Sequence, residues 1–300
     1  MLAIALGLGS SFLWGLADYL GGVKSRVFPV AVVLATMYLA SLTVMTLFVV
    51  GRGEGPPGTD AILAGLCAGL FGIGALMAFY RALAIGTMSI VAPVASTGVA
   101  LPVLVGIATG DQPGLVRSVG LAAAVIGVVL ASRDTRSDLQ RPIRPGTGDD
   151  ASAAGTADPR LRRQSIVLAV VAGLGFGMYF VLAEVASSGD IGWALLLSRI
   201  AATPFVVAFA VLALRRGATR PRGRELLAFA GIGLLDLGAN FFYNHATTVG
   251  ELSTVAVASS LYPVTTVLLA AALLGERVRG VQRAGVVVAL CGVVLISAGA

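Results

Sequence analysis

Charged side chains are scarce in this sequence. Only 12% of its 300 residues are charged, 57% are hydrophobic, and the mean hydropathy is +0.93. A soluble domain needs about twice that share of charge, roughly a quarter, to cover its surface. The composition therefore excludes an ordinary water-soluble fold. It predicts a multi-pass protein of a cell membrane (plasma or inner) whose apolar side chains face lipid.

Reactive side chains are also few: one His, one Lys and two Cys. Cys67 and Cys291 lie in separate apolar runs, and their spacing matches neither a metal site nor a disulfide framework. The stretch Leu20–Ser25 lacks the glycine that a phosphate loop needs before its lysine, which argues against an ATP-driven pump. Because HExxH-type spacing is absent too, we expect no metal and no cofactor.

The net charge of +6 would suit a nucleic-acid-binding protein, but its distribution does not. The basic residues gather in short segments between apolar runs, which is typical of loops at a membrane face. Nucleic acid is therefore excluded as a partner, and the lipid bilayer is expected instead.

Ten apolar stretches are each long enough to cross the ~30 Å hydrocarbon core as a helix of about 20 residues. They fall approximately at 2–22, 29–50, 61–84, 88–109, 115–132, 165–187, 191–214, 225–247, 252–274 and 281–299. Residues 133–164 are polar, rich in Pro and Gly, and have little to bury, so they predict a flexible linker. The predicted units are a first five-helix repeat (1–132), the linker (133–164) and a second five-helix repeat (165–300).

The two sets of helices are copies of each other. Three aligned pairs carry the repeat: Gly110-Asp111 with Gly275-Glu276 at an offset of 165, Phe79-Tyr80 with Phe242-Tyr243 at 163, and Leu16-Ala17-Asp18 with Leu182-Ala183-Glu184 at 166. An odd number of helices per copy starts the second copy on the opposite side of the membrane. The sequence therefore predicts an all-α integral membrane protein with ten transmembrane helices, arranged as two inverted five-helix repeats. Such repeats place a binding site at their interface near the midplane.

Four short motifs connect the chain to a known family. They are Trp14-Gly15, Phe79-Tyr80-Arg81-Ala82-Leu83, Leu261-Tyr262-Pro263-Val264 and Leu274-Gly275-Glu276-Arg277. With these motifs the chain resembles the EamA-like family of the drug/metabolite transporter superfamily, over both repeats. It departs from the family pattern at Gly110-Asp111-Gln112, where the family has Gly-Glu-Arg. The resemblance implies a secondary transporter, from a family in which export of amino acids or other metabolites is common.

The basic residues also predict an orientation. With ten spans, the loops on the linker side hold 17 of the 21 Lys and Arg residues, and the opposite loops hold only Arg52 and Arg117. The positive-inside rule then places the linker in the cytoplasm and both termini outside. Members of the EamA-like family are often drawn with both termini inside the cell, so the charge count and the resemblance predict opposite orientations.

The predicted span 225–247 carries a polar stripe. Asp236, Asn240, Tyr243 and Asn244 follow one another at i, i+4, i+7 and i+8, on a single helix face. Such a stripe in a spanning helix must line water, a ligand or another helix. A cavity is favoured over hydrogen bonding between helices, because four polar groups exceed what helix packing requires.

Arg199 lies in the middle of another span and needs a counter-charge, which Asp236 or Glu184 would supply. Two interpretations stay open for it: a buried structural ion pair, or a site for a substrate carboxylate. Together with aromatic residues of both repeats, these groups form the predicted substrate cavity: Trp14, Tyr80, Arg199, Asp236, Asn240, Tyr243 and Asn244.

Three further ionisable residues are candidates for proton coupling: Asp18, its repeat mate Glu184, and His245. The two carboxylates would bind protons or a cationic group of the substrate, or they would act as anchors at a membrane interface. His245 has a suitable pKa range for a proton relay, but a lone His near a helix end is more often a hydrogen-bonded interface residue.

We therefore expect a secondary transporter that moves small metabolites, amino acids or related polar solutes, outward by alternating access. Its partners would be the small-molecule substrate and protons. The alternatives are an intramembrane enzyme, for which no nucleophile–base pair is evident, and a membrane scaffold or partner subunit. In a scaffold, the polar stripe would be purely structural.

Overall fold

The computed structural model describes residues 1–85, 91, 94–111, 113–131, 159–266, 269 and 280–298. Among these residues there are helices and turns but no β-strand. The helices are α1 (Leu2–Ser25), α2 (Val30–Arg52), α3 (Thr59–Ile85), the 3₁₀ turn η1 (Thr97–Val99), α5 (Ala100–Thr109), α6 (Leu115–Ala131), α7 (Pro159–Ser187), α8 (Ile191–Arg215), α9 (Gly223–Val249), α10 (Leu252–Ser259) and α12 (Gly280–Ala298).

Six of the described helices are long and apolar enough to cross a membrane. They are α1, α2, α3, α8, α9 and the Arg163–Ser187 part of α7. A 23-residue helix such as α2 is about 35 Å long, which exceeds the ~30 Å hydrocarbon core. The six agree within three residues with the spans predicted from hydropathy. Large apolar side chains on their outer faces are exposed, as lipid contact requires; Leu47, Leu174 and Leu227 are examples.

Two of the predicted spans, 88–109 and 252–274, are not continuous helices in their described parts. The 3₁₀ turn η1 interrupts the first before α5, and α10 ends at Ser259 before a turn at Ser260 and Leu261. A proline follows each interruption, Pro102 in α5 and Pro263 after α10. Proline has no N–H and its ring collides with the carbonyl four residues earlier, so the helix breaks on its N-terminal side. Residues 86–90, 92–93, 267–268 and 270–279 lie outside the described part.

The predicted linker 133–164 is shorter in the structure at its C-terminal end. Helix α7 already begins at Pro159, because the fixed φ of proline suits the first position of a helix. The remaining linker residues, up to 158, lie outside the described residues.

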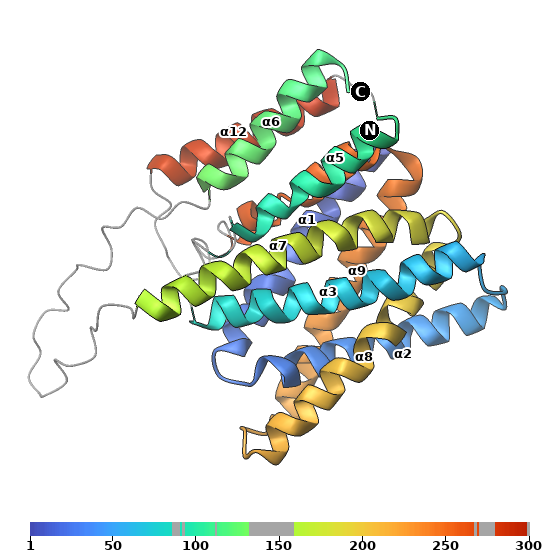
Figure 1. Cartoon of the computed structure of the whole chain (residues 1–300), viewed down its shortest axis with the longest axis vertical. Helices are drawn as coiled ribbons and strands as arrows, with labels where there is room; N and C mark the ends of the chain where they lie inside the picture. Colours follow the sequence, from blue (N-terminus) through green and yellow to red (C-terminus); the bar gives the residue numbers. More distant parts are fainter. Residues whose placement is uncertain are drawn as a thin grey trace, which may run out of the picture.

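The helices pack in pairs that join distant parts of the chain. Helix α1 packs against α9, α3 against α7, α2 against α8, and α5 against α10. Helices α6 and α12 lie side by side at one edge of the molecule, apart from the α2–α8 pair at the opposite edge (Figure 1).

Glycines allow two of these helix pairs to approach closely. A Cβ atom on Gly69 of α3 would lie 2.7 Å from Cα of Ser198 in α8. Likewise, a Cβ atom on Gly233 of α9 would lie 2.6 Å from Cα of Met37 in α2. Real Cβ atoms do not come this near to backbone, so both crossings depend on glycine, as close crossings of apolar helices generally do. These crossings set how α2, α3, α8 and α9 surround the centre of the molecule.

Candidate functional site

The polar stripe of α9 faces the interior of the molecule. Asp236, Asn240, Tyr243 and Asn244 are all buried, with exposed fractions of 9% or less. Two of them, Asp236 and Asn240, line a central cavity. The helix face predicted from this spacing is therefore buried in the structure. The contacts of its side chains set the geometry of the site.

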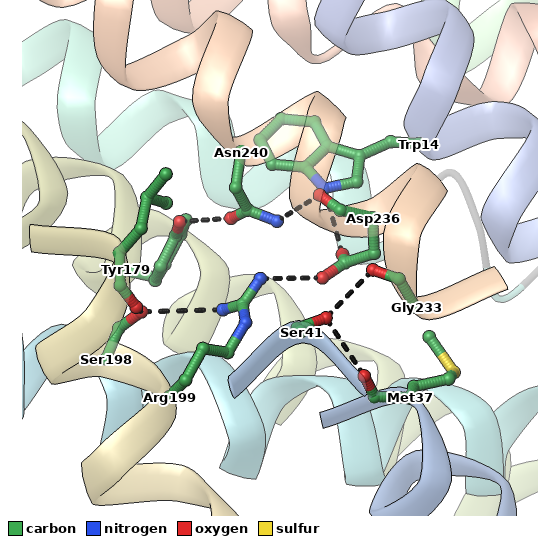
Figure 2. A network of polar contacts seen from close by, with 10 residues as sticks. Trp14, Met37, Ser41, Tyr179, Ser198, Arg199, Gly233, Asp236 and Asn240 are labelled. Atoms are coloured by element: carbon green, nitrogen blue, oxygen red, sulfur yellow. Dashed lines mark hydrogen bonds and ion pairs between the residues drawn. The ribbon is translucent and has the colours of Figure 1, made fainter. Parts of the chain in front are cut away.

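The Asp236 carboxylate connects three helices (Figure 2). Its Oδ2 atom accepts a hydrogen bond from Nη2 of Arg199 in α8 at 2.9 Å, which is also an ion pair. Its Oδ1 atom accepts a hydrogen bond from Nε1 of Trp14 in α1 at 3.2 Å. Arg199 is 2% exposed and Asp236 is 9% exposed, so the pair is buried and each charge depends on the other.

The Arg199 guanidinium is held on further sides. It lies over the ring of Tyr38 from α2, with 4.9 Å between its carbon and the ring centroid, and Nη1 donates to Oγ of Ser198 at 3.4 Å. A cation over an aromatic face is attracted by the ring quadrupole. The Nε atom of Arg199 is buried without a hydrogen-bond partner in the described part of the chain.

Asn240 extends the network to α7. Its Nδ2 donates to the backbone carbonyl of Asp236 at 2.6 Å, and its Oδ1 accepts from the hydroxyl of Tyr179 (Figure 2). These two contacts orient the amide and place Tyr179 beside the charged pair. The network therefore joins α1, α2, α7, α8 and α9 around one point.

The central cavity has a volume of about 50 Å³ for the centres of water-sized molecules, several times the roughly 10–15 Å³ that one water needs. It lies between α1, α2 and α3 from the first half of the chain and α7, α8 and α9 from the second half. Tyr262, which follows α10, also lines it. Its lining residues are Trp14, Asp18, Tyr38, Gly72, Leu76, Phe176, Tyr179, Phe180, Arg199, Asp236, Asn240 and Tyr262.

Asp18 is the second carboxylate in this lining. It lies one turn beyond Trp14 on α1, within electrostatic reach of Asp236, Tyr80 and Tyr262. Among the described residues its carboxylate has no hydrogen bond and no ion pair. Asp18 therefore presents an acidic group to the cavity, whereas the charge of Asp236 is already paired with Arg199.

Five of the ten predicted residues line the cavity, namely Trp14, Asp18, Arg199, Asp236 and Asn240. Tyr80 and Tyr243 lie outside it: each is fully buried, and its hydroxyl donates to a backbone carbonyl, of Ala17 at 3.5 Å and of Phe180 at 3.0 Å.

The other three predicted residues are also outside the lining. Asn244 is buried behind it, one turn beyond Asn240 on α9. Glu184 is half-buried, within electrostatic reach of Asp111 in the loop after α5. The half-buried His245 ring stacks on Phe241, which is exposed.

Sequence reasoning missed most of the aromatic wall. Phe176, Tyr179 and Phe180 of α7 follow one another at i, i+3 and i+4, which places them on one helix face. That spacing was a usable signal. Tyr38 and Tyr262 stand alone in apolar segments, so only the packing of α2 and the break after α10 bring them to the cavity.

The described residues contain no group of three or more His, Cys, Asp or Glu side chains arranged to hold a metal ion. Cys67 and Cys291 are both exposed and unpaired with each other. The chemistry of the cavity is thus ion pairing, hydrogen bonding and aromatic contact.

Comparisons with known proteins agree with this architecture. No curated protein matches the sequence. A solved structure, described only as a crystal structure of a protein, aligns with a TM-score of 0.73 at 17% identity, over 98% of this chain and 95% of that chain, and thereby shares its fold. The sequence model of the EamA-like transporter family matches residues 1–133 and 163–298. The chain therefore belongs to the EamA-like transporter family, within the drug/metabolite transporter superfamily.

Proposed function

We propose that this chain is a secondary transporter of a cell membrane that exports small polar metabolites, amino acids or related solutes, by alternating access. One observation carries the proposal: a cavity with a charged network lies between three helices from each half of the chain. Ionisable groups inside membrane-length helices are costly and usually serve a substrate or ion pathway.

The helix pairing supports an inverted repeat. The repeat mates are α1 and α7, α2 and α8, and α3 and α9. When each helix is exchanged for its mate, the α1–α9 pair becomes the α7–α3 pair, and the α2–α9 pair becomes the α8–α3 pair. The pairs α2–α8 and α6–α12 each consist of two repeat mates, so the exchange leaves them unchanged. A pairing pattern of this kind is expected of two copies related by a two-fold axis in the membrane plane, the arrangement that lets a central site open alternately to each side.

Matching side-chain contacts support the same relation. Tyr80 and Tyr243, predicted repeat mates, each donate to a carbonyl on the first helix of their own half, 63 residues earlier in both cases. The glycine crossings form a second related pair, because Gly69 meets α8 and Gly233 meets α2.

Polar contacts also join the halves at one end of the bundle. Arg52 at the end of α2 donates through Nη1 and Nη2 to Asp190, the N-cap of α8, at 3.2 and 2.9 Å. Asp111 after α5 accepts from the backbone N–H of Ser253 in α10 at 2.9 Å. In the proposed ten-span topology both contacts lie on the side of the termini. Alternating access requires that these contacts break when the cavity opens to that side.

In this proposal Trp14, Arg199, Asp236 and Asn240 contact the solute, and Asp18 is the candidate for proton coupling because it lines the cavity without a partner in the described residues. Tyr80 and Tyr243 support the walls from behind.

The test is flux in proteoliposomes that contain the purified full chain, with pooled labelled amino acids and metabolites, with and without a pH gradient. We expect saturable counterflow of one solute class, which depends on the gradient if protons are coupled. Asp236→Asn and Asn240→Ala should raise the half-saturating concentration, because both residues line the cavity. The exposed Asp60→Asn serves as the matched control.

Flux that is absent for every pool would contradict the transport proposal. Unchanged transport and affinity in both cavity variants would instead contradict the assignment of α9 to the solute site.

A further inference from the structure

We propose that the cavity selects organic monocations, amines or quaternary ammonium compounds with an aromatic or other apolar body, and that Asp18 is the residue that selects them. The inference rests on the proposed transport function and assigns its substrate to one charge class, organic cations, in place of the zwitterionic amino acids named there. It follows from the charges and the aromatic lining of the cavity.

With both carboxylates ionised, the charge balance of the lining is negative. It contains one guanidinium, Arg199, and two carboxylates, Asp18 and Asp236. Arg199 and Asp236 neutralise each other at 2.9 Å. The Asp18 carboxylate has no compensating cation among the described residues. An unpaired charge inside a membrane-spanning segment is costly, so a ligand that brings one positive charge stabilises the occupied cavity.

A zwitterionic amino acid fits this balance less well. Its ammonium group would pair with Asp18, and its carboxylate would be a third negative group facing a single guanidinium that Asp236 already holds. The unpartnered Nε–H of Arg199 offers that carboxylate one donor. With Asp18 paired to the ammonium and Asp236 to Arg199, the solute carboxylate would still add one uncompensated negative charge, which a single donor does not offset. A solute with an amine and no acid group avoids this repulsion.

The cavity wall suits the apolar body of such a cation. Its aromatic residues are Trp14, Tyr38, Phe176, Tyr179, Phe180 and Tyr262. Trp14 and Phe180 lie with ring centroids 5.6 Å apart, and Tyr179 and Phe180 with 5.8 Å, which forms a nearly continuous surface. Organic cations are bound by such surfaces through cation–π attraction in addition to apolar contact. Trp14 lies one helical turn from Asp18, so the carboxylate and the aromatic surface meet the same ligand.

The test compares phenethylamine with phenylalanine, which differ only by the carboxylate. Binding of each to the purified full chain is measured by isothermal titration calorimetry. We expect phenethylamine to bind at least tenfold more tightly than phenylalanine. Asp18→Asn should weaken phenethylamine binding at least tenfold, whereas Asp60→Asn, which removes an exposed carboxylate in the first turn of α3, should leave it unchanged.

Two outcomes would overturn the inference: phenylalanine that binds as tightly as phenethylamine, or no measurable binding of the amine to the wild-type chain. Because the ligand comparison uses the unmodified protein, it stands even if Asp18→Asn fails to fold. In that case Asp18→Glu, which keeps the charge, should retain the preference for the amine. Amine binding without any flux would refute the transport function alone, and flux of zwitterions without amine binding would refute the charge selection alone.

Discussion

At the scale of the residue, the Asp236 carboxylate determines how α1, α8 and α9 meet. It accepts from Trp14 and Arg199 at once, and Arg199 rests on Tyr38. Of the two interpretations left open for Arg199, the structure contains the buried ion pair, and Arg199 also lines the cavity. The site for a substrate carboxylate stays a prediction. A residue that serves the fold also forms part of the wall that a solute would contact.

The ion pair leads to a stability prediction. Asp236→Asn leaves the Arg199 charge buried without a counter-charge, and breaking such a pair on one side costs about 3–5 kcal/mol. We expect a clearly lower thermal unfolding temperature for the purified protein. The double variant Asp236→Asn/Arg199→Gln should lose much less stability than the two single variants lose together, because neither buried charge remains. If the stability losses of the single variants simply add in the double variant, the two residues are not energetically coupled.

At the scale of the element, proline and glycine shape the helices in different ways. Pro102 and Pro263 follow interruptions in the fourth and ninth predicted spans. The break after α10 allows Tyr262 to line the cavity. Gly69 and Gly233 leave their helices intact and instead permit close crossings with α8 and α2.

The crossing of α9 and α2 is testable with a matched pair of substitutions. Gly233→Ala places a methyl group 2.6 Å from Cα of Met37, so the helices must separate, at a cost of about 1–3 kcal/mol. Gly231→Ala, on the exposed face of the same helix, meets nothing within 4 Å. We expect thermal unfolding at a lower temperature for Gly233→Ala only. Equal effects of the two variants would mean that the close crossing does not contribute to stability.

At the scale of the whole molecule, the orientation in the membrane is the property to be measured. The count of 17 basic residues against two predicts a cytoplasmic linker and external termini. In a background with Cys67→Ala and Cys291→Ala, single cysteines are introduced as Gly55→Cys in the loop after α2, or Thr219→Cys in the loop after α8. An impermeant maleimide should label the first in intact cells and the second only after permeabilisation. The reverse result would invert the orientation, and labelling of both from outside would contradict the odd number of spans in each half.

Much of the helical organisation could be predicted from the sequence because lipid imposes it locally. Each spanning segment must satisfy its own backbone hydrogen bonds and expose apolar side chains, so hydropathy located the six long helices. The stripe from Asp236 to Asn244 could be predicted as one buried face for a similar reason, because residues i and i+4 lie on the same face of any helix.

The sequence by itself therefore determined that this is a membrane protein, where its long helices run, which family it belongs to, and that Asp236 and Arg199 need partners. Only the tertiary structure decided which groups meet. It paired Arg199 with Asp236 rather than Glu184, brought Asp18 but not Glu184 to the cavity, and placed Tyr80 and Tyr243 behind its wall. These outcomes depend on how each helix is rotated and how closely it crosses its neighbours. Contacts between residues far apart in the chain set both quantities, and no local pattern contains them.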